Sequence, residues 1–460
     1  MVVLTAVLAT GAACDGGGGG DNGGGNGGGT DADAAPTDGT SDVGDVADAT
    51  DPADGTTADG ETTDGEGGRS VYRGFGVVEV GGSSRYYAAE YTEGTTLSSF
   101  VLGENPFGSG NIGLAASQQR VFVLDQACAD TPSNCDGPQR GSVEQVQVAE
   151  SEGFNQLNTF VLPRGTYDPR DVAYVDANQR FYVTSSQSAK IYAYESGNKK
   201  NVKTFDTAPF DEDTAANGDD DPDPGQMVVD GKRLLVTLRM FAQVKNDEGD
   251  FVPAAESNAK LAVLDTESGE FMDFDSGASG EQALGLQIGN AIGIERAADG
   301  VWAVGLRGRD RSDDGAIVRL ERTDEDSYQV GETLVGEGRL GGRLESFAMT
   351  GEFTGVAVVS PLVGEGTPPS LVRFDASGEG DVQTQKLDQM TWPGTGVCAT
   401  PDNAQVWAND VRATPRNGMR IFDTETWELV NDQPWGPRAK TPECVIPFLE
   451  HATGGADASG

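Results

Sequence analysis

The stretch DVAYVDANQRFYVTSS (171–186), followed by KIYAYE (190–195), carries the clearest structural signal in this chain. Apolar and polar residues alternate in it, and β-branched and aromatic residues are frequent, a pattern typical of strands. The Asp, Ala and Asn residues at its centre mark a turn between two strands. A third strand in KIYAYE and a weaker fourth in VKTF (202–205) complete the prediction of one four-stranded antiparallel sheet.

The same pattern recurs along the chain at intervals of about 50 to 65 residues. Further copies of the strand pair are IGLAASQQRVFVLD (112–125), MVVDGKRLLVTL (227–238), AIGIERAADGVWAVGL (291–306), FAMTGEFTGVAVVS (347–360) and GVCATPDNAQVWAND (396–410). Third strands follow in KLAVLD (260–265), AIVRLE (316–321), SLVRFD (370–375) and MRIFD (419–423). Four strands per repeat at this period predict a β-propeller, in which each repeat forms one blade.

The two ends of the repeat region complement each other. Three strands near the start lack a first strand: VYRGFGVVEV (71–80), RYYAAEY (85–91) and TLSSFVLG (96–103). The segment PECVIPF (442–448) resembles a first strand with nothing after it. Joining them completes a seventh blade and leaves no open sheet edge. We therefore predict an all-β, seven-bladed propeller over 69–450, with a flexible tail at 451–460; a pair of β-sandwich domains is the competing fold.

A segment of different composition precedes the repeats. Residues 15–68 contain 18 glycines and 14 acidic residues in 54 positions, with no lysine, arginine or aromatic residue. Such a segment cannot bury enough apolar surface to offset the entropy lost on ordering. We expect a disordered, self-repelling tether.

The chain begins with a short apolar stretch that ends in Gly11-Ala12-Ala13-Cys14, directly before the tether. This arrangement resembles a bacterial lipoprotein signal. The resemblance implies a signal over 1–14, acylation of Cys14, export, and a lipid anchor in the cell envelope, at the outer membrane or the cell surface. The alternative is an unmodified N-terminus with an isolated cysteine.

Four further cysteines remain: Cys128, Cys135, Cys398 and Cys444. An even number in an exported chain suggests two disulfides. Cys128 and Cys135 flank a short loop and form the natural local pair, which leaves Cys398 and Cys444 as the second pair. That second bond would join the inner strands of two neighbouring blades. The alternative is four free thiols.

The charge balance excludes several classes of protein. The chain has 74 acidic and 32 basic residues and a formal net charge of −42. This argues against nucleic-acid binding, because phosphate contacts need clustered lysine and arginine. His451 is the single histidine, so there is little material for histidine metal sites or Ser-His-Asp triads. No run of 18 apolar residues occurs, so we expect no membrane-spanning helix.

The repeats show a partial match to a known group. Tyr182-Val183-Thr184-Ser185, followed by KIYAYE, resembles the YVTN repeat. Residues 70–450 as a whole resemble bacterial seven-bladed propellers of the YVTN, lactonase-like and WD-repeat-like group. The resemblance implies a ligand-binding face where loops joining second and third strands meet loops that enter first strands.

Loops expected on that face carry arginine, which is scarce in this chain. These residues are Arg239, Arg307, Arg309, Arg311, Arg412 and Arg416. Arginine binds carboxylates and phosphates through paired hydrogen bonds, so we consider these residues candidate ligands of a small anion. The alternative is a solvated loop in which Arg309 and Arg311 pair with neighbouring aspartates.

An acidic loop supplies a second candidate site. It carries Asp219, Asp220, Asp221 and Asp223, a density of oxygen ligands that could hold calcium. The spacing does not fit an EF-hand, and a solvated acidic loop is the alternative.

These observations predict a monomeric, lipid-anchored binding protein whose propeller face binds a small anionic ligand or a partner protein. One alternative is a lactonase-like or calcium-dependent hydrolase. The other is a purely structural surface protein.

Overall fold

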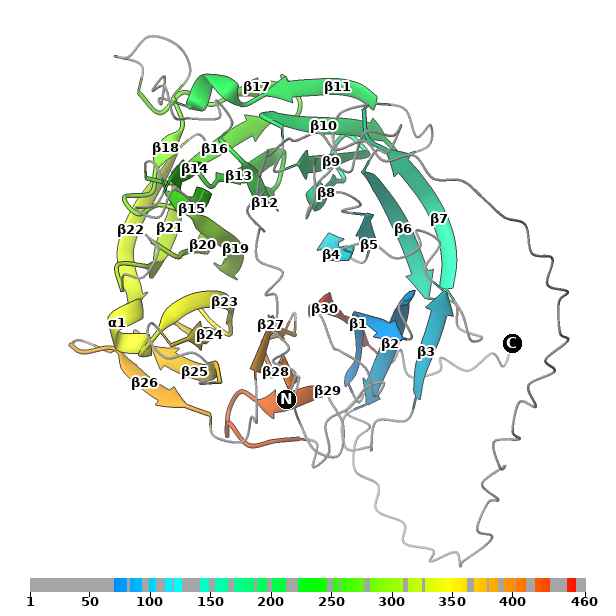
Figure 1. Cartoon of the computed structure of the whole chain (residues 1–460), viewed down its shortest axis with the longest axis vertical. Coiled ribbons are helices and arrows are strands. Elements are labelled where there is room, and N and C mark those ends of the chain that lie inside the picture. Colours follow the sequence, from blue (N-terminus) through cyan, green and yellow to red (C-terminus); the bar gives the residue numbers. More distant parts are fainter. Residues whose placement is uncertain are drawn as a thin grey trace, which may run out of the picture. The chain divides into compact units, whose positions relative to one another are not determined.

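The computed structural model describes the strands of the repeat region and many of the turns between them (Figure 1). The residues described are 70–80, 83–92, 99–104, 112–117, 120–125, 141–148, 154–163, 169–185, 188–196, 201–211, 222–245, 251–255, 258–275, 277, 282–308, 313–324, 327–361, 368–378, 380–387, 393–400, 402–410, 418–430 and 445–451. All of them belong to one compact unit. The predicted signal, tether and tail lie outside them, apart from His451.

Four blades consist of four consecutive antiparallel strands each. The first contains β4 (Ile112–Ser117), β5 (Arg120–Asp125), β6 (Ser142–Val148) and β7 (Phe154–Val161). The second contains β8 (Pro169–Val175), β9 (Arg180–Ser185), β10 (Lys190–Glu195) and β11 (Asn201–Asp206). The third contains β19 (Ala291–Ala298), β20 (Val301–Leu306), β21 (Ala316–Asp324) and β22 (Ser327–Gly336). The fourth contains β23 (Arg343–Met349), β24 (Thr354–Ser360), β25 (Ser370–Asp375) and β26 (Gln383–Lys386).

Two blades depart from this scheme. In the first of these blades the strand order is β12 (Pro224–Asp230), β13 (Arg233–Leu238), β16 (Lys260–Asp265) and β17 (Glu270–Phe271). A fifth strand, β18 (Leu284–Gly285), also pairs with β16. A separate hairpin, β14 (Phe241–Lys245) with β15 (Phe251–Ala255), is inserted between its second and third strands. The other blade has three strands within the described residues, β27 (Pro393–Ala399), β28 (Gln405–Asp410) and β29 (Gly418–Asp423).

The remaining blade is built from both ends of the repeat region. Its order is β3 (Ser99–Glu104), β2 (Ser83–Thr92), β1 (Ser70–Val80) and β30 (Val445–His451). Strand β30 runs antiparallel to β1, with Ser70 opposite His451 and Phe75 opposite Val445. The two segments expected to share a blade therefore pair with each other.

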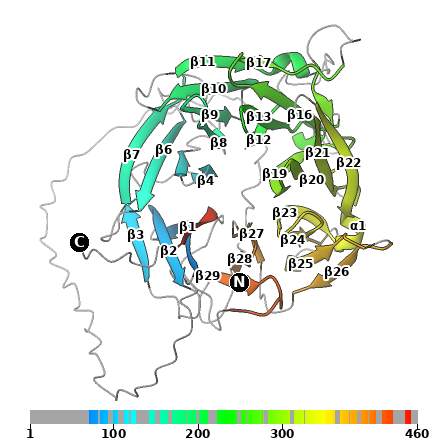
Figure 2. The same ribbon diagram turned by 180° about the vertical axis from the view of Figure 1, so that it is seen from behind.

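The first strands of the blades lie side by side around a common axis (Figure 2). Contacts join β4 to β8, β8 to β12, β12 to β19, β19 to β23, β23 to β27, and β27 to β30, and β30 also contacts β4. We call these seven strands the inner strands. The fold is an all-β, seven-bladed propeller, as the repeat period predicts.

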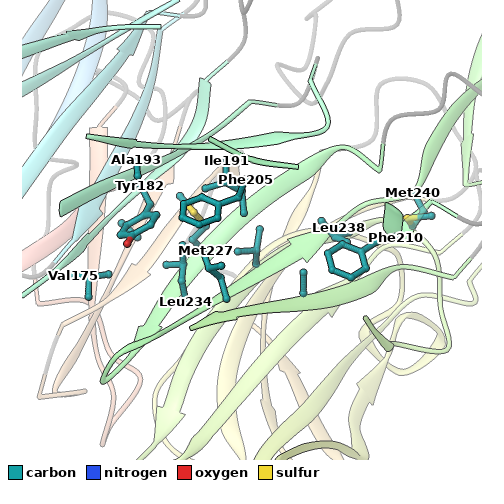
Figure 3. Close-up of a cluster of buried hydrophobic side chains, with 14 residues drawn as sticks. Val175, Tyr182, Ile191, Ala193, Phe205, Phe210, Met227, Leu234, Leu238 and Met240 are labelled. Carbon is teal, nitrogen blue, oxygen red and sulfur yellow. The ribbon is translucent and has the colours of Figure 1, made fainter. Parts of the chain in front are cut away.

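The hydrophobic core lies between the faces of neighbouring blades. Figure 3 shows one such layer, in which Tyr182 and Phe205 from one blade pack with Met227 and Leu234 of the next. These four side chains are at least nine-tenths buried. Full burial of a side chain of this size contributes about 1.5–3 kcal/mol, so each blade interface is a major source of stability.

Close contact between blades depends on glycine at one position. Phe347 of β23 packs on Gly305 of β20, where a Cβ atom would lie 2.5 Å from a ring carbon of Phe347. Among the described residues, two short helices connect strands: a 3-10 turn at Ala208–Phe210 and α1 (Glu337–Leu340). Within the described ranges, no helix has the length and apolar character needed to cross a membrane.

Candidate functional site

Several inner strands contain a bulge near the end where they begin. Strands β8, β12, β19 and β23 each carry one more residue than the partner strand over a short stretch, at Pro169/Asp171, Pro224/Met227, Ala291/Gly293 and Leu344/Ser346. A bulge redirects the adjoining side chains and is frequent beside functional sites. The polar residues at these bulges are therefore the first candidates for a site.

Asp171 lies at the bulge of β8 and reaches the next blade. Its two carboxylate oxygens accept hydrogen bonds from the backbone N–H groups of Val172, at 2.8 Å, and Met227, at 2.6 Å. Burial among the inner strands raises the pKa of Asp171 to about 7, against the opposing effect of these two donors. The residue as a whole is only partly buried.

Gln226 lies at the bulge of β12, directly before Met227. Its Oε1 accepts a hydrogen bond from the backbone N–H of Ile294 on β19, at 3.2 Å. The rest of the side chain is exposed. Asp171 and Gln226 thus make the same kind of contact. In each case a polar side chain of one inner strand accepts a hydrogen bond from a backbone N–H of the next inner strand.

Glu295 follows Ile294 on β19 and is partly buried. Burial raises its pKa to about 7, and the negative charge of Asp171 raises it further. The two carboxyl groups are therefore close enough to interact, although one blade separates their strands. Asp171, Gln226 and Glu295 form what we call the inner carboxyl site.

The inner carboxyl site has the properties of an acid–base pair. Like charges in a poorly solvated region disfavour double ionisation, so the proximity of the two groups favours the protonated form of one of them. Paired carboxyl groups whose pKa values lie near the working pH are suited to proton transfer. This arrangement can remove a proton from one group and deliver one to another.

Arg307, a predicted anion ligand, has a different role in the structure. Its guanidinium forms an ion pair with Glu345 and donates a hydrogen bond from Nε to the backbone oxygen of Leu344, at 3.0 Å. The Arg307 and Glu345 side chains are only 7% and 6% exposed. The charge of Arg307 is therefore paired with Glu345 inside a blade interface, and its binding of an anion stays a prediction.

A buried carboxyl group lies beside this pair. Glu337 of α1 accepts hydrogen bonds from the backbone N–H groups of Leu344, at 2.7 Å, and Gly315, at 3.0 Å. Burial raises the pKa of Glu337 to about 7, and the nearby charges of Arg343 and Arg307 oppose the shift. Glu337 connects three chain segments and is fully buried, so we regard it as structural.

The other predicted arginines are largely outside the described residues. Arg239 donates from Nε to Oδ1 of Asn290, at 3.4 Å, and its backbone oxygen accepts from the Asn290 N–H. It therefore fixes the segment that leads into β19. Arg309, Arg311, Arg412 and Arg416 lie outside the described residues, and their anion binding stays a prediction.

Most of the predicted calcium ligands also lie outside the described residues. Asp219, Asp220 and Asp221 lie outside the described residues, whereas Asp223 leads into β12 with a left-handed φ of 49°. The part of the chain that the structure describes contains no group of three or more potential metal ligands.

Of the four cysteines predicted to form disulfides, only Cys398 lies within the described residues. Cys398 in β27 is disulfide-bonded. Cys14, Cys128, Cys135 and Cys444 lie outside the described residues, so lipidation at Cys14 and the pairing of the others stay predictions.

Sequence analysis missed the inner carboxyl site. Asp171 and Glu295 both lie inside quoted strands, DVAYV and AIGIER, where they were treated as ordinary strand residues. One signal was available, because a charged residue at the start of an otherwise apolar inner strand has to be stabilised by a nearby polar group.

Comparison with solved structures supports the fold. A putative 6-phosphogluconolactonase from Bacteroides uniformis aligns with a TM-score of 0.53 and 10% identity, over 83% of this chain and 99% of that chain. A putative 6-phosphogluconolactonase from Bacteroides fragilis aligns with a TM-score of 0.51 and 11% identity, over 85% and 100%. At these identities the likeness shows a shared propeller fold. No protein-family model and no curated protein matches the sequence.

Proposed function

We propose that this protein is a lactonase-like hydrolase that opens cyclic esters at the inner carboxyl site. The observation that carries the proposal is the pair Asp171 and Glu295, two interacting carboxyl groups with pKa values raised to about 7. The shared fold supports it, because the two structural neighbours described above are named as putative lactonases.

The two carboxyl groups would divide the work of hydrolysis. The two backbone donors at Asp171 favour its charged form, which makes Asp171 the base that takes a proton from water. The resulting hydroxide adds to the lactone carbonyl. Glu295 holds the shared proton and delivers it to the ring oxygen as the C–O bond breaks. The proton then returns from Asp171 to Glu295, and the product hydroxy acid ionises into solvent.

The first prediction concerns Glu295. We expect E295Q to lower the rate of hydrolysis on the order of 10²-fold, because glutamine occupies the same space but cannot supply the proton. For the wild-type protein the rate should fall as the pH rises above about 7, where Glu295 loses its proton. A pH-stat assay with δ-gluconolactone and other five- and six-membered lactones, corrected for spontaneous hydrolysis, measures both effects.

A carboxylate in a surface turn provides the matched control. Glu352 pairs with Arg319 and lies in the turn between β23 and β24. We expect E352Q to retain wild-type activity. Equal activity of E295Q and E352Q would exclude Glu295 as the acid, and the absence of lactone hydrolysis by the wild-type protein would rule out the proposed function.

The binding role predicted from sequence remains a separate possibility. Arg307 is paired with Glu345, and four of the six arginines lie outside the described residues. Anchoring through Cys14, export and a protein partner likewise stay predictions.

A further inference from the structure

We infer that Gln226 binds the carbonyl oxygen of the substrate through its side-chain amide N–H group. The inference rests on the proposed function and assigns a third residue to the same site. It starts from the position of Gln226 on β12, the inner strand between the strands that carry Asp171 and Glu295.

The hydrogen bond to Ile294 fixes which way the amide faces. A backbone N–H requires an acceptor, so Oε1 of Gln226 must point toward Ile294. The Nε2 group is then the end of the amide left to donate, on a residue that is exposed to solvent. An accessible donor of fixed orientation is what a developing negative charge on oxygen requires.

The backbone around Gln226 is held from several sides. The backbone oxygen of Gly225 accepts from Thr184 Oγ1 at 2.7 Å, and that of Gln226 accepts from Thr237 Oγ1 at 3.1 Å. The next N–H, of Met227, donates to Asp171. The carboxylate of Asp171 is therefore hydrogen-bonded to the peptide group that links Gln226 to Met227.

The neighbouring strand leaves space for the side chain. A Cβ atom at Gly293 would lie 2.9 Å from Oε1 of Gln226. The absence of a side chain at Gly293 thus lets the amide lie against β19. Such fixed dipoles need no reorganisation during reaction, which is the source of their effect on rate.

A purely structural role for Gln226 makes a different prediction. In that case the hydrogen bond to Ile294 would only join two blades, and the Nε2 group would be dispensable. Q226E separates the two roles, because glutamate keeps an acceptor for Ile294 but has no N–H to donate. Q226L removes both the acceptor and the donor.

The test compares Q226E, Q226L and E352Q with the wild-type protein. For Q226E we expect a melting temperature close to that of wild type and a kcat lower on the order of 10²-fold, with a smaller change in KM. The rate should fall at every pH between 5 and 9, whereas an effect of the added charge would only displace the pH profile. Wild-type kcat in Q226E would overturn the inference while leaving the proposed function intact.

A binding measurement keeps the two proposals distinguishable. Gluconolactam carries the same carbonyl group but resists hydrolysis, and its affinity is measurable by calorimetry. If the wild-type protein hydrolyses no lactone, loss of lactam binding in Q226E but not in E352Q would still support Gln226 as the carbonyl donor. Equal affinity in Q226E and wild type, or no binding by the wild-type protein, would refute it.

Discussion

At the scale of single residues, Arg307 shows how a buried charge can connect two neighbouring blades through an ion pair. It projects from the end of β20, and its partner Glu345 lies on the inner strand of the next blade. Burial lowers the pKa of Arg307, and the charge of Glu345 opposes this shift. A buried pair of this kind gives little net stability, yet loss of either partner leaves an uncompensated charge in the interface.

We therefore predict an asymmetric result for this ion pair. R307M should lower the free energy of unfolding by about 3 kcal/mol, because it leaves the charge of Glu345 buried without a partner. The double variant R307M/E345M should recover most of that loss. Urea denaturation of the three proteins measures these differences. If R307M lowered the free energy of unfolding by less than about 1 kcal/mol, the result would contradict the burial of the Arg307–Glu345 pair.

Residue roles were the part least predictable from sequence. The scarcity of arginine in an acidic chain drew attention to Arg307, but its partner lies 38 positions further along the chain. Asp171, Gln226 and Glu295 come from three separate repeats, and only the ring arrangement places them together. Local patterns do not carry such long-range pairings, so the site required the structure.

At the scale of elements, the alternation of apolar residues predicted the strands of most blades. It did not predict the bulges of the inner strands, because one extra residue leaves the pattern on either side unchanged. The inserted hairpin β14–β15 was also missed. Its residues were treated as part of the variable loop between the second and third strands.

The short helix α1 gives a prediction of pH dependence. The pKa of Glu337 is about 7 in the folded protein and near 4.5 in a free side chain, so the folded state holds a proton that the unfolded state releases. The stability due to the protonated group is present below about pH 4.5 and is lost as the pH rises through 7.

Thermal or urea unfolding between pH 4.5 and 7.5 measures this effect. Over that range the free energy of unfolding of the wild-type protein should fall by up to about 3 kcal/mol more than that of E337Q, whose side chain does not titrate. E352Q serves as the control and should follow the wild-type curve. A wild-type curve parallel to that of E337Q would show that Glu337 does not titrate in this window.

At the scale of the whole molecule, the ring depends on the blade shared by the two ends of the repeat region. Its strand β30 pairs with β1 and contacts β27, which carries Cys398. The repeat period predicted this arrangement because it left three strands at one end and one at the other. The number of blades was therefore readable from sequence even where single strands were weak.

The last prediction concerns the bond at this junction. Cys398 is disulfide-bonded, and Cys444, its predicted partner, directly precedes β30. A Cys398–Cys444 bond would close a loop of about 46 residues and restrict the unfolded chain, which is worth about 4 kcal/mol. We expect C398S to lower the free energy of unfolding by up to this amount, and C128S/C135S to cost less, because the loop between those two cysteines is short.

Peptide mapping under non-reducing conditions identifies the partner directly, and urea denaturation measures the cost of each variant. A peptide that joins Cys398 to any cysteine other than Cys444 would disprove the predicted pairing. If C398S proved as stable as wild type, the ring would be held by strand pairing and blade packing alone.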